Sequence, residues 1–403
     1  MNRRVVVTAI NTINSLGFSV DECWESLLAG RSGVKRISLF DPSDLETKIA
    51  AELPAGFEEL SSKLIKKRTA RQMTRVSQMA LTCAIDAVSH YKVDVDYYSK
   101  EKCAVILGVI NTGNSSVEKD NDIKNMILKG MNNSVSAWIS LEYGFEGPNF
   151  TVSTACASSA YAIALGYDMI NSGKADMVIT GGTDSIINPE EIRGFNAIYA
   201  LSTRNDSPEK ASCPFSKNRD GFVIGEGAGI VILEAEETAV KRSAAILAEL
   251  KGYALTSEAY NIVSPKEDGE GMYVTMKKAI ENSGISPADI DHINAHGTST
   301  ELNDLYETRA IKKLFGNRAK QIPVVSSKSM IGHTIGAAGA IEAVITVKSL
   351  IEQTVHPTIN TDEQDPELDL DYVKLCRKQK MTYAMSNSFG FGGHNASLVF
   401  KAY

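Results

Sequence analysis

The sequence predicts an α/β fold, with helices covering the faces of its sheets. Two observations lead to this fold class. Apolar runs of strand length alternate along the chain with segments whose apolar residues recur every three or four positions. The run Val105–Val109 is apolar on both faces, which is typical of a strand buried within such a sheet. With 403 residues, 43% of them hydrophobic, the chain can bury one large core or two or three smaller ones.

The expected elements follow one another in this alternating order. Strands are expected where β-branched and other apolar residues run together, at Arg4–Ala9, Cys103–Val109, Met177–Thr180, Gly229–Leu233, Ile290–Ala295, Pro323–Ser326 and Tyr383–Ser386. Helices are expected where the apolar spacing is helical, at Val20–Ala29, Arg75–His90, Ala157–Ser172, Met272–Ser283, Asp304–Phe315 and Ala338–Gln353. The charged stretch Glu234–Arg242 is the predicted seam between an N-terminal half, residues 1–245, and a C-terminal half, residues 246–403.

Composition narrows the class of protein. A net charge of −7 argues against nucleic acid as the main partner. No apolar run reaches the length of a transmembrane helix, and the N-terminus leads directly into a strand without a signal peptide. The six cysteines are scattered without a C-x-x-C pair or zinc-like spacing. We therefore expect free thiols, no metal site, no membrane partner and a cytoplasmic location.

One cysteine stands in a context that suits a nucleophile. Cys156 lies among small residues in the segment Ser153–Ala160, between a short β-prone run and a helical pattern. The first turn of a helix has unpaired N–H groups and the positive end of the helix dipole, and both favour a thiolate. The alternative is an inert, buried cysteine, which is common in folded proteins.

Three later segments combine polar side chains with small residues. His296 leaves a predicted strand in the segment Asn294–Thr300, and Lys328 and His333 share the loop within Ser326–Ala340. Strand ends of this kind are where α/β proteins bind ligands, although a histidine there can also simply bond to backbone. The third segment, Ser386–Asn395, places two phenylalanines between glycines, as in a mobile loop or a tightly packed hairpin.

These segments occur in the same order as the motifs of a known family. Together with Gly147–Asn149, Leu201–Asp206 and Asn218–Phe222, they resemble the elongating β-ketoacyl-acyl-carrier-protein synthases of the thiolase superfamily. The resemblance implies the thiolase fold, with two similar α/β halves in five layers of helix, sheet, helix, sheet and helix. It also implies an acyltransferase that joins an acyl group on Cys156 to malonyl-carrier protein by decarboxylative Claisen condensation.

The resemblance also assigns roles to residues of this chain. It makes Cys156 the acylated nucleophile, and makes His296 and His333 neutral donors to the enolate. The N–H groups of Cys156 and Phe391 would form an oxyanion hole, and Lys328 would hold the His296 region with Glu307 as its ion-pair partner. The implied substrate-binding residues are Thr298 and Thr300 on the pantetheine arm, Phe389, and Asp304, which would order the loop and the helix start.

The resemblance further implies the partners. The substrates are carried on the phosphopantetheine of an acyl carrier protein, and the chain itself needs no cofactor. Because carrier proteins are acidic, the densest basic stretch is the expected dock, although a merely solvated helix face is an open alternative. Its residues are Lys63, Lys66, Lys67, Arg68 and Arg71. A dimer is expected, either of two identical chains or with a homologous chain-length factor.

Two departures leave the pathway open between fatty acids and polyketides or polyenes. The stretch Glu301–Asp304 resembles the catalytic ketosynthase subunits of type II polyketide systems, and Val109–Asn114 lacks the glycine-rich form common in fatty-acid elongation enzymes. A degradative thiolase would need a second cysteine in the C-terminal glycine loop, where the segment Gly390–Asn395 has none. The remaining alternatives are a cysteine-dependent acyl thioester hydrolase or transferase, and a scaffold partner in a ketosynthase heterodimer.

Overall fold

The computed structural model describes residues 3–112, 123–363 and 365–403. The segment Val109–Asn114 is therefore described only as far as Thr112, and its last two residues lie outside the described part. None of the described helices has the length and apolarity that a bilayer-spanning segment requires.

An 11-stranded sheet forms the centre of the molecule, in the order β12-β10-β9-β14-β15-β8-β1-β7-β6-β4-β5. The N-terminal strands are β1 (Val5–Ile13), β4 (Cys103–Gly108), β5 (Asn149–Val152), β6 (Met177–Asp184) and β7 (Gly227–Ala235). The C-terminal strands are β8 (Ala248–Ser257), β9 (Ile290–Asn294), β10 (Pro323–Val325), β12 (Asp371–Tyr372), β14 (Tyr383–Gly390) and β15 (His394–Ala402). Among the described strands, the two groups join through β1 and β8, at the pairs Val6↔Glu249 and Val7↔Ala248. This narrow connection lets the two groups diverge and enclose a layer of helices.

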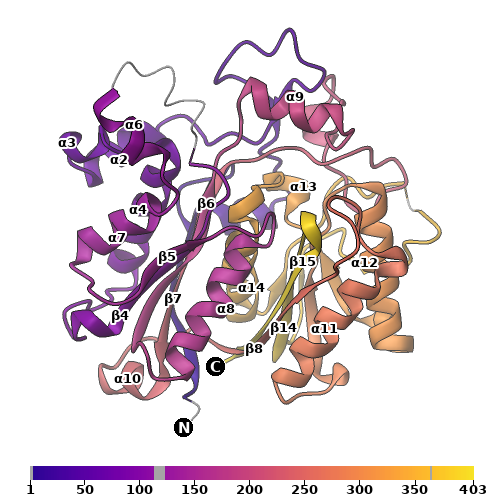
Figure 1. Cartoon of the computed structure of the whole chain (residues 1–403). Helices are drawn as coiled ribbons and strands as arrows, with labels where there is room; N and C mark the ends of the chain where they lie inside the picture. Colours follow the sequence, from indigo (N-terminus) through magenta and orange to yellow (C-terminus); the bar gives the residue numbers. More distant parts are fainter. Residues whose placement is uncertain (1–2, 113–122, 364) are drawn as a thin grey trace.

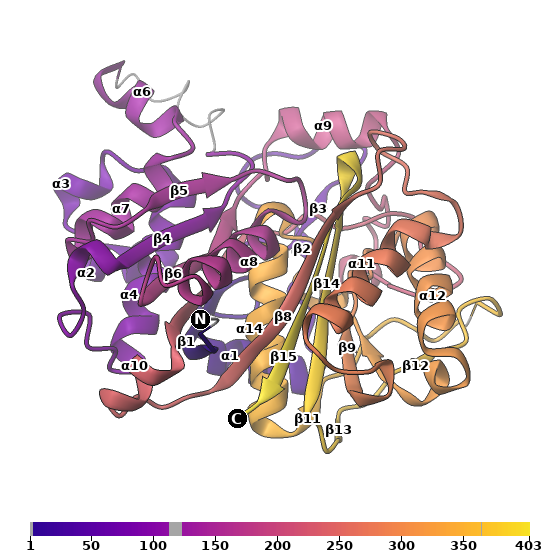
Figure 2. The ribbon, with the colours of Figure 1, turned by 60° about the horizontal axis from the view of Figure 1, so that its bottom comes forward.

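Helices complete the five layers of the thiolase fold. The helices α4 (Arg75–His90) and α7 (Ser134–Tyr143) pack on the outer face of the N-terminal strands, and α11 (Glu270–Asn282) and α12 (Glu301–Phe315) form the layer outside the C-terminal strands. The helices α8 (Ser158–Asn171) and α14 (Ala338–Glu352) run between the two groups of strands (Figures 1 and 2). The predicted fold class is thus confirmed.

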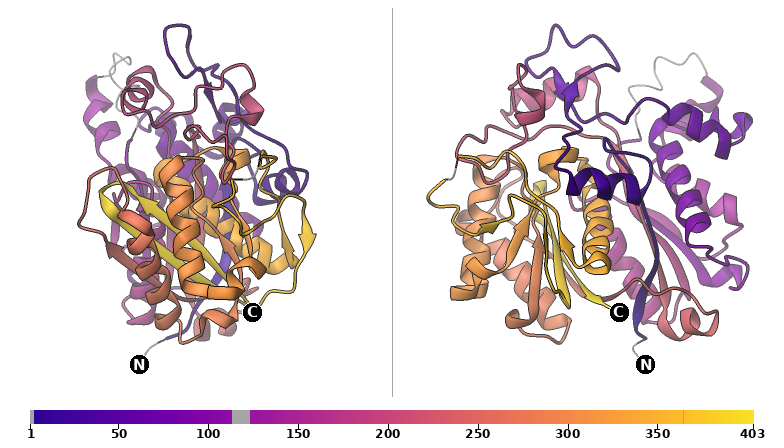
Figure 3. Two further views of the ribbon diagram at one scale, coloured as in Figure 1. Left: turned by 90° about the vertical axis from the view of Figure 1, so that its right-hand side faces the viewer. Right: turned by 180° about the vertical axis from the view of Figure 1, so that it is seen from behind.

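The remaining helices lie around these layers. They are α1 (Val20–Leu28), α2 (Phe57–Leu64), α3 (Lys67–Ala70), α6 (Ile123–Gly130), α9 (Pro189–Ala197), α10 (Glu236–Lys241) and α13 (Lys328–Ile331). The start of β1 and the end of β15 lie at one end of the molecule, and α9 lies at the opposite end (Figures 1 and 3). The carboxyl ends of the parallel strands β4, β5 and β6 point toward that opposite end, where each strand leads into a loop.

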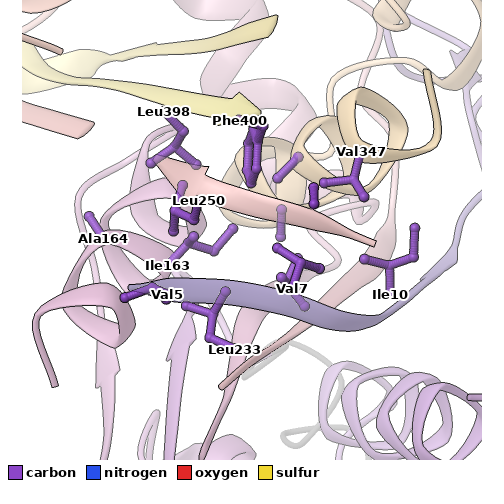
Figure 4. Packing of buried hydrophobic residues seen from close by; sticks show 14 of the residues in the cluster. Val5, Val7, Ile10, Ile163, Ala164, Leu233, Leu250, Val347, Leu398 and Phe400 are labelled. Atoms are coloured by element: carbon purple, nitrogen blue, oxygen red, sulfur yellow. The ribbon is translucent and has the colours of Figure 1, made fainter. Parts of the chain in front are cut away.

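The largest core lies between the two groups of strands. It joins Val7 of β1, Leu250 of β8, Phe400 of β15, Ile163 of α8 and Val347 of α14, all at most 1% exposed (Figure 4). Because α8 and α14 meet strands on more than one side, both are apolar over most of their surface, as expected of a central helix. This apolar layer rigidly supports the loops at its end.

Most expected elements are present, and α4 has its predicted bounds. Two long strands escaped prediction because polar residues interrupt their apolar pattern. β8 carries Glu249, which pairs with Arg4, and β15 carries Asn395 and Ser397, which are buried and hydrogen-bonded to side chains. The helix expected at Asp304–Phe315 begins earlier, at Glu301.

Candidate active site

A cavity of about 520 Å³ opens between loops from both halves of the chain. Cys156 comes from the N-terminal half, and His296, His333 and Phe391 come from three segments of the C-terminal half. One potential ligand atom from each of Cys156, His296 and His333 lies within 4.8 Å of the other two. The structure therefore brings together the nucleophile and the two histidines that the sequence singled out.

The backbone holds Cys156 in a tight junction between β5 and α8. Ala155, just before it, has a φ of +49°, in the left-handed region that non-glycine residues rarely adopt. Ser158 locks the turn, because its Oγ accepts the N–H of Thr154 at 2.8 Å and donates to the carbonyl of Ala155 at 2.6 Å. Gly390 permits close approach, since a Cβ there would lie 3.1 Å from the nitrogen of Cys156. The structure thus places the cysteine at the predicted strand-to-helix junction.

The surroundings of Cys156 raise the pKa of its thiol. Burial raises its pKa to about 11, while the charge of Lys328 and the N–H groups of Cys156 and Phe391 act in the opposite direction. Desolvation thus outweighs the partners that favour a thiolate at this position. The same two N–H groups converge on the sulfur, so they also lie close to the carbonyl oxygen of any acyl group bound there.

Both histidines are neutral, and both carry their proton on Nε2. Burial lowers each pKa well below its usual range, and the nearby charge of Lys328 lowers it further. The Nζ of Lys328 lies 3.4 Å from Nδ1 of His296, and a lysine ammonium can only donate. The N–H of Ile335 donates to Nδ1 of His333 at 3.2 Å. With both Nδ1 atoms accepting hydrogen bonds, each ring offers an Nε2–H donor.

The ion-pair partner of Lys328 is Glu342 on α14, so the prediction of Glu307 was wrong. Lys328 and Glu342 are each 1% exposed, and Lys328 also donates to the carbonyl of His296 at 2.7 Å. Burial raises the pKa of Glu342 to about 7, against the charge of Lys328. The sequence did contain a signal for this pair, because Glu342 stands among alanine, glycine, isoleucine and valine in the first half of α14.

Glu307 positions the backbone of the histidine loop instead. Its carboxylate accepts the N–H groups of His296 and Gly297, both at 2.9 Å, and the side-chain amide of Asn387 at 3.2 Å. Burial raises its pKa to about 7, despite these three hydrogen bonds. Glu307 thus holds the end of β9 against α12. Its carboxylate is hydrogen-bonded to the backbone of the histidine loop and is not the ion-pair partner of Lys328.

The predicted substrate-binding residues divide into two groups. Thr298, Thr300 and Phe389 line the cavity, and the two threonine hydroxyls lie 2.8 Å apart. Asp304 lies behind the wall, fully buried, where it accepts the N–H of Phe215 at 2.8 Å. The prediction that Asp304 contacts substrate is therefore corrected. Asp304 instead orders the loop and the first turns of α12 from behind the cavity wall.

Sequence reasoning missed Asp184, a fully buried carboxylate at the end of β6. Its oxygens accept the N–H groups of Ile110 at 3.3 Å, Ser185 at 3.0 Å and Gly336 at 3.1 Å. Burial raises its pKa to about 7. Gly336 follows Ile335, whose N–H holds Nδ1 of His333, so Asp184 links the cavity wall to the histidine loop. The only sequence signal was an acid ending an apolar strand.

The predicted carrier-protein dock lies away from the cavity, on α2 and α3 and the turns beside them (Figure 1). Its five residues are all exposed, and Lys63 pairs with Glu59 at 2.7 Å. Among the described residues that line the cavity, none belongs to this group. Docking at this surface therefore stays a prediction.

The spacing of Cys156, His296 and His333 would also suit a metal ion, since cysteine and histidine are ligands of zinc. A structural zinc site normally has four protein ligands, and a catalytic zinc site has three and an open position, which is the number that this group supplies. The prediction that the chain needs no metal stays a prediction.

Comparisons with known proteins point to one family. The family model described as the beta-ketoacyl synthase N-terminal domain matches residues 2–239, and the C-terminal domain model matches residues 247–362. The 3-oxoacyl-[acyl-carrier-protein] synthase 2 of Synechocystis sp. is 40% identical over 415 residues, covering 100% of this chain and 98% of that protein. The protein of the same description from Coxiella burnetii is 41% identical over 408 residues, or 98% of each chain.

Solved structures give the same result. One structure holds a type II polyketide synthase acyl-carrier protein in complex with its ketosynthase bound to the hexaketide, and it matches with a TM-score of 0.92 at 30% identity. The ishigamide ketosynthase/chain length factor matches with the same two values. In both cases the match covers 100% of this chain and of the solved chain.

Proposed function

The chain belongs to the beta-ketoacyl synthase family, and from this premise we propose how its site joins an acyl group on Cys156 to a malonyl group, with both substrates delivered on acyl carrier protein. One observation carries the proposal. A cysteine thiol, two backbone N–H donors and two neutral imidazoles with Nε2–H groups meet in one cavity. Such an arrangement can stabilise two oxyanions in turn.

Acylation is the first half-reaction. The sulfur of Cys156 attacks the carbonyl of the acyl-carrier thioester, and the N–H groups of Cys156 and Phe391 stabilise the oxyanion that forms. The bond to the carrier sulfur then breaks, and the thiol proton of Cys156 ends on the released carrier thiol. Because the proton passes from one thiol to another, the half-reaction needs no net base.

Condensation is the second half-reaction. Malonyl-carrier thioester loses CO₂, and the electron pair of the broken C–C bond forms an enolate, whose oxygen accepts hydrogen bonds from His296 and His333. The enolate carbon attacks the acyl group on Cys156, a new C–C bond forms, and the cysteine leaves as thiolate and takes a proton from solvent. Lys328 keeps His296 in the required tautomer, and its charge disfavours an imidazolium.

We further propose the setting in which the enzyme works. Free cysteines and carrier-bound substrates suit the cytoplasm, and the basic residues of α2 and α3 suit an acidic carrier protein. The chain pairs either with a second copy or with a homologous chain-length factor, in a fatty-acid or polyketide pathway of the dissociated type. The narrow β1–β8 connection supports a division of the chain into two halves near residue 245.

Intact-protein mass spectrometry tests the proposed function. Acyl-carrier thioesters of several lengths are added to the purified chain, followed by malonyl-carrier protein. We expect an acyl adduct that vanishes as a β-ketoacyl-carrier product appears, and no adduct on the Cys156→Ala variant. Hydrolysis of the acyl thioester without malonyl-dependent extension would contradict the proposal and favour a hydrolase. An adduct on the Cys156→Ala variant would also contradict it.

A further inference from the structure

One part of the cavity differs chemically from the rest of its wall. One part of the lining, the apolar arm, consists of residues from a single hydrophobic cluster: Ile110, Ile186, Phe195, Phe222 and Ile335. Its polar counterpart is the side with Thr298 and Thr300. Under the proposed function, the threonine side takes the pantetheine and the apolar arm takes the acyl chain. The wall of the apolar arm nevertheless contains a carboxylate, that of Glu191 on α9.

Glu191 is held at the wall by an amide. The Nδ2 of Asn111 donates to Oε1 of Glu191 at 3.0 Å, and both side chains line the cavity. In the part of the chain that the structure describes, the second carboxylate oxygen, Oε2, has no hydrogen-bond partner, and no lysine or arginine pairs with this residue. Glu191 therefore presents one unused hydrogen-bond acceptor to the cavity.

This acceptor disfavours a saturated chain. A hydrocarbon that fills the arm would displace water from the carboxylate and offer no hydrogen bond in return, which is costly for a charged group. A chain with a hydroxyl group at that depth would restore the lost hydrogen bond. An ammonium group could also donate, but it would have to leave water and pass the isoleucines and phenylalanines of the arm with its full charge.

We propose that the apolar arm takes an acyl chain that carries a hydroxyl group toward its far end, and that Glu191 accepts the hydrogen bond of this hydroxyl. Asn111 is the positioning residue that fixes the carboxylate. The inference rests on the proposed function, since it assumes that Cys156 is acylated. It deepens that function by naming a hydroxylated acyl chain as the preferred substrate.

The test compares pairs of acyl-carrier thioesters of equal length, with and without a terminal hydroxyl, from butanoyl to dodecanoyl. The rate at which each pair acylates Cys156 is followed by intact-protein mass spectrometry. At the length that reaches Glu191, we expect the hydroxylated member to load about tenfold faster, as one regained hydrogen bond to a charged group would allow. Equal rates, or faster loading of the saturated member, at every length would overturn the inference.

Two variants assign the preference to this side chain. Glu191→Leu should abolish the preference and speed loading of the saturated chain. Glu190→Leu is the matched control, because Glu190 is the preceding residue of α9 and is exposed outside the cavity wall, and it should leave the preference unchanged. A preference that survives in Glu191→Leu, or that vanishes equally in Glu190→Leu, would contradict the role of Glu191.

Short chains separate this inference from the proposed function. A butanoyl chain is too short to fill the arm, so it should load equally well into the wild type and both variants. If butanoyl loads but no length shows a hydroxyl preference, the inference fails and the proposed function stands. If no chain of any length loads, the proposed function fails and the inference fails with it.

Discussion

The two halves of the chain supply very different surroundings to the same cavity. Around Cys156 the groups are backbone groups: the N-terminal half supplies a left-handed residue, a hydroxyl-locked turn and the N–H of Cys156, and the C-terminal half adds the N–H of Phe391. Around His296, the C-terminal half uses buried charges, with Lys328 and Glu342 paired beside the ring. The difference teaches that acylation depends on backbone geometry, whereas condensation depends on two neutral imidazoles, one of them held by a buried lysine and its carboxylate partner. The two half-reactions should therefore be separable by mutation.

The Cys156→Ala variant should have the largest effect, because the acyl acceptor is removed. We expect acyl loading to fall below detection by intact-protein mass spectrometry, while malonyl decarboxylation continues, since His296 and His333 remain. Loss of decarboxylation together with loading would mean that the two sites depend on each other. A circular dichroism spectrum equal to that of the wild type would show that the variant is folded.

The variants His296→Ala and His333→Ala should produce the opposite pattern. Each removes one donor to the enolate, so condensation should fall by about 10²–10³-fold. Loading should change little, because the N–H groups of Cys156 and Phe391 are untouched. Single-turnover rates of loading and of ketoacyl formation, measured on the same preparation, give the two values. Equal loss in both steps would contradict the separation.

Alkylation of the empty enzyme measures how strongly burial controls the thiol. Because the pKa of Cys156 is raised to about 11, its thiolate fraction should grow about tenfold per pH unit between about pH 7 and pH 10. The rate of carboxamidomethylation by iodoacetamide should grow in proportion. Peptide-level mass spectrometry distinguishes this site from the exposed Cys376. A rate that levels off near pH 7 would mean that the thiolate is the resting form.

Asp184→Asn tests the link between the cavity wall and His333. The amide retains one acceptor oxygen where the carboxylate serves several N–H groups, so the loop at Gly336 should loosen. We expect condensation to slow by about tenfold, as for loss of one hydrogen bond to a charged group. Butanoyl loading should stay near the wild-type rate. Glu234→Gln is the control, because Glu234 is a buried carboxylate near the opposite end of β6, and it should leave the ratio of the two rates unchanged.

The difference in the free energy of unfolding between the wild type and Asp184→Asn should depend on pH with a defined sign. Folding raises the pKa of Asp184 to about 7, so the folded state holds its proton more tightly than the unfolded state. The stability from this group is present below its unfolded pKa of about 3.9 and is lost as the pH rises toward 7. Urea unfolding should show the free energy of unfolding of the wild type falling relative to Asp184→Asn over this range. An unchanged difference would contradict the raised pKa.

The smallest effect is expected at the basic surface of α2 and α3. Charge reversal by Lys67→Glu should raise KM for the carrier-bound substrate severalfold and leave kcat unchanged, and the effect should shrink at high salt. Lys278→Glu on α11 is the matched control, because Lys278 is equally exposed and lies on the other half of the chain. The same KM change in both variants would argue against a dock on α2 and α3.

The sequence carried more information about the elements than about their contacts. The long periodic segment Arg75–His90 was predicted with its observed bounds, because apolar spacing is a local property. β8 and β15 were missed, because Glu249 and Asn395 find their partners on other segments. A polar residue inside a strand can only be recognised as buried once its distant partner is known.

The candidate site divides in the same way, between residues that the sequence indicated and contacts that only the folded chain shows. The sequence singled out Cys156, His296, His333 and Lys328 as candidates, because each lies among small neighbours between predicted elements and in a motif of the family that the chain resembles. The pairing of Lys328 with Glu342 and the Nε2–H tautomers required the folded chain. So did the role of Asp184 and the raised pKa of the thiol. Residue type is written along the chain, whereas a tautomer or a pKa depends on burial and on partners that folding brings close from distant positions.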